Sequence, residues 1–148
     1  MYEWAREGFL RLTGDPSENR EAIWSLGGRY VAFASARVNG VTRNIYLQRS
    51  NGSGAVQRLT DSNTNQFPKS WHPRGEVLAF VESTRGRKIM ILPMEGSDTV
   101  GWKAGKPYAF DDSPVPENNP ALLTGRQMDR IRFVGKRERR DLCTAFSQ

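Results

Sequence analysis

Residues 24–33 read Trp-Ser-Leu-Gly-Gly-Arg-Tyr-Val-Ala-Phe, and residues 71–80 read Trp-His-Pro-Arg-Gly-Glu-Val-Leu-Ala-Phe. The two stretches are copies of one motif, 47 residues apart, in which the tryptophan precedes the phenylalanine by nine residues. Upstream of each copy, Arg11-Leu12-Thr13 returns as Arg58-Leu59-Thr60 at the same distance. A period of about 40–50 residues is typical of β-propeller blades and similar arrays. The repeat therefore predicts an all-β fold.

Short strand-like stretches surround both copies. Asn44 to Gln48 alternates polar and apolar residues, as a half-buried strand does, and Lys88 to Leu92 is apolar on both faces after its first residue. Each unit reads as four strands: one leads into the tryptophan, one ends at the phenylalanine, and a third covers 43–49 or 87–92. The fourth leads to Leu59-Thr60 or to about Phe110. Asn51-Gly52 and Glu95-Gly96 are predicted turns after the third strands.

The units divide the chain into four parts. Residues 1–13 are expected to be the closing strands of a preceding unit, because Phe9 to Thr13 parallels Val56 to Thr60. Residues 14–60 and 61–110 are the first and second units, and residues 111–148 are a linker and a degenerate third unit. The chain is thus expected to begin inside a unit.

The repeat predicts a structural role for a set of matched positions. The aromatic residues are expected to wedge between adjacent sheets, each burying roughly 150–250 Å², and the glycines to form turns. The set comprises Leu12, Thr13, Trp24, Gly28, Ala32, Phe33, Ile45, Tyr46, Gly52, Leu59, Thr60, Trp71, Gly75, Ala79, Phe80, Ile89 and Gly96.

These residues resemble the TolB-like (WD40-like) propeller repeat over about residues 1–110. That repeat reads Pro-x-Trp-Ser-Pro-Asp-Gly-(Arg/Lys)-x-Ile-Ala-Phe, then Ile-Tyr-Val, an Asp-Gly turn and Arg-Leu-Thr. The first copy departs from it at Leu26-Gly27, and the second at His72 and Arg74; both departures are expected to weaken the turns. The resemblance implies a partial β-propeller of about two four-stranded antiparallel blades plus remnants. It implies architecture rather than activity, since such propellers are binding platforms in unrelated proteins.

The pattern stops after Asn119-Pro120. Allowed codons from Leu122 onward, read one nucleotide later, can encode FSPDGRWIAFVSSANESGEIYVQPFP, which is close to a third unit. Codon choice creates part of this match, but any Met-Asp pair must give tryptophan in that frame, as Met128-Asp129 does. The hypothesis is a frameshifted tail from about residue 122; the alternative is a divergent basic C-terminus. Codons that cannot give the shifted reading would disprove the hypothesis.

Charge and composition weigh against several function classes. The net charge of +6 comes mostly from residues 121–148, which carry 7 basic and 3 acidic residues, against 15 and 13 in residues 1–120. Nucleic-acid binding would therefore depend on the tail, and it is not expected. No apolar run is long enough for a membrane span and no signal peptide is recognisable. The compartment stays open, because a single cysteine, Cys143, forms no internal disulfide.

The sequence does not predict catalysis. His72 is the only histidine and stands where the repeat has a turn residue, and no cysteine pair is present, so neither a zinc site nor another cofactor is expected. Ser53 lies in a Gly-rich turn, where Asn51-Gly52-Ser53 also meets the glycosylation sequon; the turn is the preferred interpretation. Asp111-Asp112 and Glu117 are expected to form a Pro-rich loop rather than a carboxylate site. Trp102-Lys103 is expected to pack rather than contact nucleic acid.

The expected function is a non-catalytic binding or sensor propeller fragment that contacts a protein or a small ligand within a larger parent protein. Lys106-Pro107, Glu117 and the shifted reading of the tail resemble propellers attached to bacterial Ser/Thr kinases and winged-helix regulators. The alternative is a gating propeller fragment of a prolyl-oligopeptidase-type serine peptidase. Two units alone leave strand edges and apolar faces uncovered, so self-association is also expected.

Overall fold

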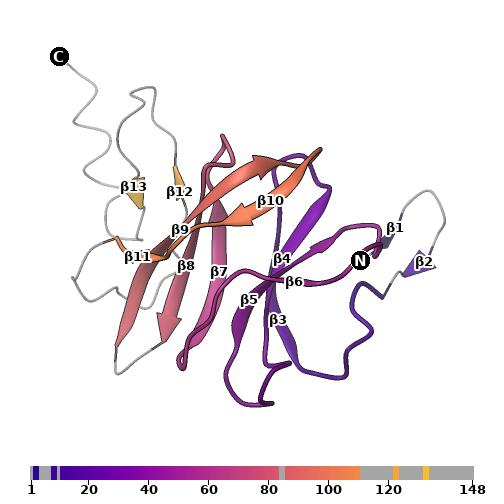
Figure 1. Cartoon of the computed structure of the whole chain (residues 1–148), viewed down its shortest axis with the longest axis horizontal. Coiled ribbons are helices and arrows are strands. Elements are labelled where there is room, and N and C mark those ends of the chain that lie inside the picture. The colour runs from indigo at the N-terminus through magenta and orange to yellow at the C-terminus, as the bar shows by residue number, and fades with distance from the viewer. Residues whose placement is uncertain are drawn as a thin grey trace.

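The protein is described here by a computed structural model, which covers residues 2–3, 8–9, 11–83, 86–110, 122–123 and 132–133. Over these residues the chain is all-β, as predicted, and none of them lies in a helix. Two antiparallel sheets stand side by side and make up most of the molecule (Figure 1). No helix in this described part is long and apolar enough to cross a membrane.

The first sheet contains β3 (Asn19–Trp24), β4 (Tyr30–Ser35), β5 (Asn44–Arg49) and β6 (Gln57–Arg58), paired in that order. Each strand is joined to the next by a hairpin. β4 is buried along its whole length, because it is the strand that is apolar on both faces. A β-bulge interrupts the β3–β4 register between Arg20 and Ile23.

The second sheet repeats this order with β7 (Asn65–Trp71), β8 (Val77–Ser83), β9 (Arg87–Ser97) and β10 (Gly101–Ala104). β11 (Tyr108–Ala109) pairs with β9 on the same edge as β10 does, and the Phe110 N–H donates to the Ile89 carbonyl at 2.9 Å. The predicted fourth strand leading to about Phe110 is therefore present in two pieces. Like β3, β7 carries a bulge, here between Pro68 and Ser70.

The predicted turn at Glu95-Gly96 is wrong, because β9 runs on to Ser97 and the turn follows it. Gly96 pairs with Trp102 across the β9–β10 hairpin and has a φ of 115°. A Cβ on Gly96 would lie 2.0 Å from the Gly101 carbonyl oxygen. Glycine is therefore needed here for the close approach of two strands rather than for a turn.

Two short strand pairs lie outside the large sheets. β1 (Tyr2–Glu3) pairs with β2 (Gly8–Phe9), and β12 (Leu122–Leu123) pairs with β13 (Arg132–Phe133), both antiparallel. The remaining residues of the predicted closing strands before residue 11, and of the predicted third unit after 110, lie outside the described residues. The assignment of these segments to neighbouring units therefore stays a prediction.

One apolar core joins the two sheets. Its buried members are Tyr30, Ala32, Ile45, Leu47 and Leu59 from the first unit, and Trp71, Leu78, Phe80, Leu92 and Met94 from the second. Leu78, Phe80 and Leu92 are completely buried, and each fully buried side chain of this size stabilises the fold by roughly 1.5–3 kcal/mol. The core lies between the facing surfaces of β4–β5 and β7–β9.

The two sheets are stacked in the same sense. Along β4, Ala32 faces the second sheet and belongs to the core, so Phe33 points to the opposite face. Along β8 the corresponding Phe80 faces the first sheet and lies in the core, whereas Ala79 points away. The alanine face of the first sheet (Ala32) therefore packs on the phenylalanine face of the second sheet (Phe80). The phenylalanine face of the first sheet and the alanine face of the second sheet both point away from this interface.

Candidate binding surface

A cavity of about 340 Å³ opens on the face of the first sheet that points away from the second. We call this cavity the outer socket; its lining includes Leu12, Thr13, Asn19, Trp24, Val31 and Phe33, together with Arg20, Glu21 and Ala22. Trp24 pairs with Val31 across β3 and β4, which places both side chains on this face. The cavity is at the lower end of the range of about 300–1,000 Å³ typical of ligand sites.

The prediction that both motif tryptophans are wedged between sheets is wrong for Trp24. Its side chain is 50% exposed, whereas Trp71 is only 6% exposed. The physical reason is the stacking sense: Trp71 faces the first sheet, and Trp24 lies on the face that the second sheet does not cover. Trp71 also packs on Trp102, with ring centroids 5.0 Å apart.

The residues 47 positions after the outer socket form an equivalent site that is filled. We call it the inner socket; it consists of Leu59, Thr60, Gln66, Trp71, Leu78 and Phe80. The side chains that occupy it are Ala32, Ile45 and Leu47 of the first sheet, which belong to the same core. The structure therefore contains one copy of the socket with its occupant and one copy whose cavity no strand among residues 11–83 and 86–110 fills.

Polar groups at the rim of the inner socket bind the strand that fills it. The Ile45 N–H donates to Thr60 Oγ1 at 2.9 Å, and the Leu59 N–H donates to the Ile45 carbonyl at 2.8 Å. Arg58 Nε donates to the Thr60 carbonyl at 2.9 Å, and its Nη2 donates to Asn44 Oδ1 at 2.5 Å. Backbone pairing and one arginine–asparagine contact thus fix this strand in register.

The outer socket has the arginine–threonine contact of the inner socket but differs in the partner of the threonine hydroxyl. Arg11 Nε donates to the Thr13 carbonyl at 2.9 Å, the same contact that Arg58 makes with Thr60. Thr13 Oγ1, however, accepts a hydrogen bond from Asn19 Nδ2 at 3.0 Å, where Thr60 Oγ1 accepts one from a backbone N–H of β5. Among the described residues, none takes the place of Asn44 beside Arg11.

Arg37 lies over Phe33 of the outer socket and over the neighbouring Tyr46. The Arg37 guanidinium lies 5.3 Å from the ring centroid of Phe33 and 4.7 Å from that of Tyr46. Hydrogen bonds from the Ser17 side chain and backbone, together with the positive charge of Arg37, lower the pKa of the Asp15 carboxyl. On the strand β3 itself, Glu21 has a φ of 49° and forms an ion pair with Lys69 of β7.

Asp98, in the turn between β9 and β10, connects the two sheets. Its carboxylate accepts hydrogen bonds from Ser25 Oγ at 2.8 Å, Trp102 Nε1 at 2.7 Å and the Arg29 N–H at 3.2 Å. Burial alone would raise the pKa of Asp98, but the hydrogen bonds from Trp102, Ser25, Arg29 and Gly27 together outweigh it, and the pKa is lowered. We call this arrangement the Asp98 clamp.

The clamp compensates for a departure of the first motif copy from the repeat. Gly27 stands where the resembling repeat has aspartate, and a Cβ at Gly27 would lie 2.4 Å from Asp98 Oδ2. The missing side chain thus leaves room for a carboxylate from the other sheet. Sequence reasoning missed Asp98, because a single aspartate in a turn carries no signal of a contact 73 residues away.

A second cavity, of about 480 Å³, adjoins the clamp and is lined by Tyr30, Gln57, Val100, Trp102 and Lys103 among others. Trp102 is in contact with Trp71 and Asp98, so its packing role is confirmed. The Trp102 ring also lies against Gly75: a Cβ on that residue would be 2.4 Å from Trp102 Cη2.

The catalytic candidates do not come together. His72 lies in the β7–β8 turn, where its carbonyl accepts from the Gly75 N–H at 2.7 Å, and Ser53 lies in the β5–β6 turn, where its Oγ donates to Asn51 Oδ1 at 2.7 Å. Both turn predictions are confirmed. Within the described residues, no group of three or more His, Cys, Asp or Glu side chains could hold a metal ion. Asp111-Asp112, Glu117 and Cys143 lie outside the described residues.

The remaining matched positions occupy equivalent places. Gly28 and Gly75 close the two motif turns with φ values of 68° and 79°, and Gly52 has a φ of 74° in the next hairpin. Ile45 and Ile89 occupy the third strands, β5 and β9, and Tyr46 stacks on Phe33 at 6.2 Å. The sequence repeat is therefore also a repeat of local geometry.

No protein-family model matches this chain, and no curated protein matches its sequence. The TolB-like assignment accordingly stays a prediction that depends on the residues quoted above.

Proposed function

We propose that this chain is a non-catalytic binding module, composed of two units of a β-propeller-type array, that serves a larger parent protein through contacts with a protein or a small ligand. The observation that carries the proposal is the same-sense stacking of the two sheets. Arrays of this kind grow by repeating one interface between neighbouring units. The inner socket supplies one such interface, and the outer socket offers the matching half of another.

A tandem insertion tests the proposal directly. A chain of residues 1–60 followed by residues 14–148 inserts one extra copy of 14–60, and the junction Arg58-Leu59-Thr60-Gly14 keeps the natural order of Arg11-Leu12-Thr13-Gly14. In an array, the face of the inserted sheet that carries Ala32, Ile45 and Leu47 covers the outer socket of the following copy.

The expected result is a larger urea m-value, because the inserted unit buries additional surface, together with higher stability and shielding of the downstream copy of Trp24 from a fluorescence quencher. A control carries the same insertion with its Ile45 and Leu47 changed to serine. An unchanged m-value and a protease-sensitive insert would show that the units do not stack and would refute the proposal.

The parent protein is a separate part of the proposal. A kinase or DNA-binding segment encoded upstream would support a sensor propeller of the kinase or winged-helix type. A Gly-x-Ser-x-Gly segment encoded downstream would favour the gating propeller of a serine peptidase instead. The neighbouring coding sequence decides between these two parents.

A further inference from the structure

The inner socket is filled by side chains of a neighbouring strand, and the outer socket has a cavity at the equivalent place. The occupant of the inner socket therefore indicates which kind of ligand the outer socket can bind. In the inner socket, two alternate aliphatic side chains of β5, Ile45 and Leu47, belong to the same buried cluster as Leu59 and Trp71. The Leu12 and Trp24 side chains of the outer socket stand at the same sequence spacing, and both line its cavity. Its cavity is therefore complementary to alternate aliphatic side chains of an extended strand.

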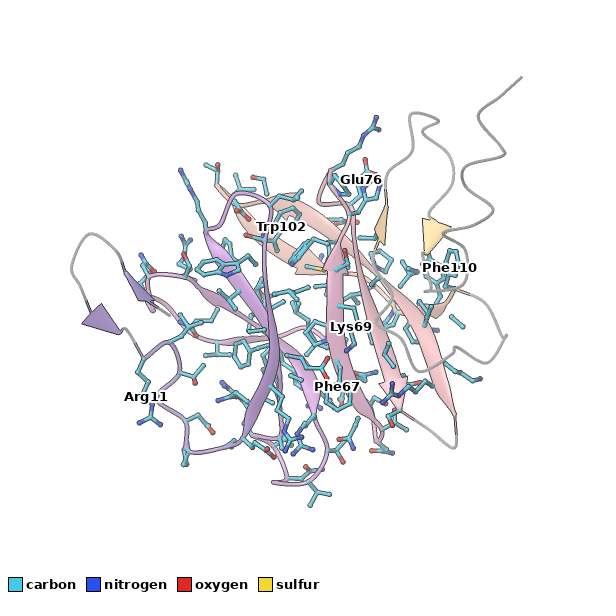
Figure 2. The ribbon with its side chains drawn as sticks, turned by 180° about the vertical axis from the view of Figure 1, so that it is seen from behind. Arg11, Phe67, Lys69, Glu76, Trp102 and Phe110 are labelled. Atoms are coloured by element: carbon cyan, nitrogen blue, oxygen red, sulfur yellow. The ribbon has the colours of Figure 1, made fainter. Side chains whose placement is uncertain are left out.

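Hydrogen-bonding groups at the rim of the outer socket indicate which polar groups its ligand should carry. In the inner socket, a backbone N–H of β5 donates a hydrogen bond to Thr60 Oγ1, and an asparagine side-chain oxygen of β5 accepts one from Arg58. Arg11 is already held by the Thr13 carbonyl in the pose of Arg58. In the part of the chain that the structure describes, Thr13 Oγ1 accepts a hydrogen bond from Asn19 Nδ2, and this bond has to open before a strand N–H reaches Thr13 Oγ1. Arg11 lies at the opposite side of the two-sheet stack from Phe110 (Figure 2), so the second sheet does not cover this rim.

We propose that the outer socket binds an extended peptide segment with the pattern Asn-aliphatic-x-aliphatic. The segment adds antiparallel to Leu12-Thr13 through backbone hydrogen bonds, as β5 pairs with Leu59. Its asparagine accepts a hydrogen bond from Arg11, and its two aliphatic side chains enter the cavity beside Trp24. Strand addition of this kind takes affinity from the main chain and specificity from alternate side chains. The proposal names the partner chemistry of the function proposed above and rests on it.

A peptide copied from the chain itself provides the probe. Residues 42–49, Thr-Arg-Asn-Ile-Tyr-Leu-Gln-Arg, contain the strand that fills the inner socket. The labelled peptide is titrated with the full chain at concentrations where light scattering shows a monomer, and its fluorescence anisotropy is measured. Saturable binding is expected. A peptide in which alanine replaces the asparagine should bind about tenfold more weakly, because a hydrogen bond to a charged group is lost.

Variants of the chain locate the binding site. Trp24→Ala should abolish binding, and Val41→Ala, at a position that is 74% exposed and away from the cavity, should leave it unchanged. Thermal melts of both variants check that they fold. Binding that survives Trp24→Ala would overturn the proposal, since the peptide would then be replacing β5 in the first sheet or binding elsewhere. Absence of binding would overturn it as well. Self-association that depends on Trp24 would instead identify a second copy of the chain as the occupant.

The tandem insertion separates the two proposals. If the inserted unit stacks but the peptide does not bind, the array stands and strand addition fails. If the insert does not stack and the peptide does not bind, both proposals fail.

Discussion

The Asp98 clamp predicts a specific failure of additivity between two substitutions. Asp98→Ala removes the acceptor of the hydrogen bonds from Ser25, Arg29, Trp102 and Gly27. A buried hydrogen bond to a charged group contributes about 1.5–3 kcal/mol. Because Asp98 is only partly buried, we expect a loss of about 2 kcal/mol for these hydrogen bonds together.

Gly27→Ala should act through the same contact. The new Cβ would lie 2.4 Å from Asp98 Oδ2 and 3.1 Å from Cγ, so the carboxylate must move away from Ser25. We expect a loss of about 1–2 kcal/mol in the free energy of unfolding. When Asp98 is already alanine, only its Cβ remains nearby, at 3.2 Å. The Gly27→Ala change should then be nearly neutral or stabilising by up to about 0.5–1 kcal/mol, because alanine restricts the unfolded chain.

The double variant should therefore be about as stable as Asp98→Ala alone, with a coupling energy of about 1–2 kcal/mol. Urea unfolding followed by tryptophan fluorescence measures all four proteins. Gly14→Ala is the matched control, since a Cβ there meets no atom within 4 Å. If the two losses add within about 0.5 kcal/mol, Asp98 does not depend on the space left by Gly27, and the clamp is not a coupling between the sheets.

Three further predictions follow from the packing, and urea unfolding or thermal melts measure them all. Trp71→Ala should cost about 3–5 kcal/mol because its side chain is almost fully buried, whereas Trp24→Ala should cost less than half as much at 50% exposure; equal losses would contradict the difference between the sockets. Gly96→Ala should cost at least about 2 kcal/mol, because alanine is strained at a φ of 115° and its Cβ meets the Gly101 carbonyl; a neutral result would argue against the close β9–β10 pairing. The folded-state pKa of Asp98 lies below its ordinary value of about 3.9, so the stability it contributes is fully present above that value and is lost as the pH falls through the folded pKa. The stability difference between the natural chain and Asp98→Asn should accordingly shrink as the pH falls below about 4, and a difference that does not decrease in this acidic range would refute this assignment.

The local elements could be predicted from the sequence, because their signals are local. Alternation in Asn44 to Gln48 and glycines after short apolar runs predict strands and hairpin turns without knowledge of the partner sheet. The sequence predicts a turn at Glu95-Gly96 because a Glu-Gly pair is typical of turns, whereas the steric need for glycine at position 96 depends on Gly101 across the hairpin.

Features that depend on stacking could not be predicted. Trp24 and Trp71 have the same local spacing, yet one is half exposed and the other buried, since their exposure depends on which neighbouring sheet covers each face. The outer socket and the Asp98 clamp have the same origin: both arise only when the direction of stacking is known.

The hairpin order of the strands has a consequence for how the chain is made. Every strand of the two large sheets pairs with a neighbour close in sequence, so loop-closure costs are small and each sheet can form soon after its last strand leaves the ribosome. The first sheet is complete at Arg58, well before the second begins to pair. The contact between Ser25 and Asp98 spans 73 residues, and it can form only once the β9–β10 hairpin exists. We therefore expect the hydrogen bonds of the Asp98 clamp to form late in folding, after the first sheet has formed and the second sheet has packed against it.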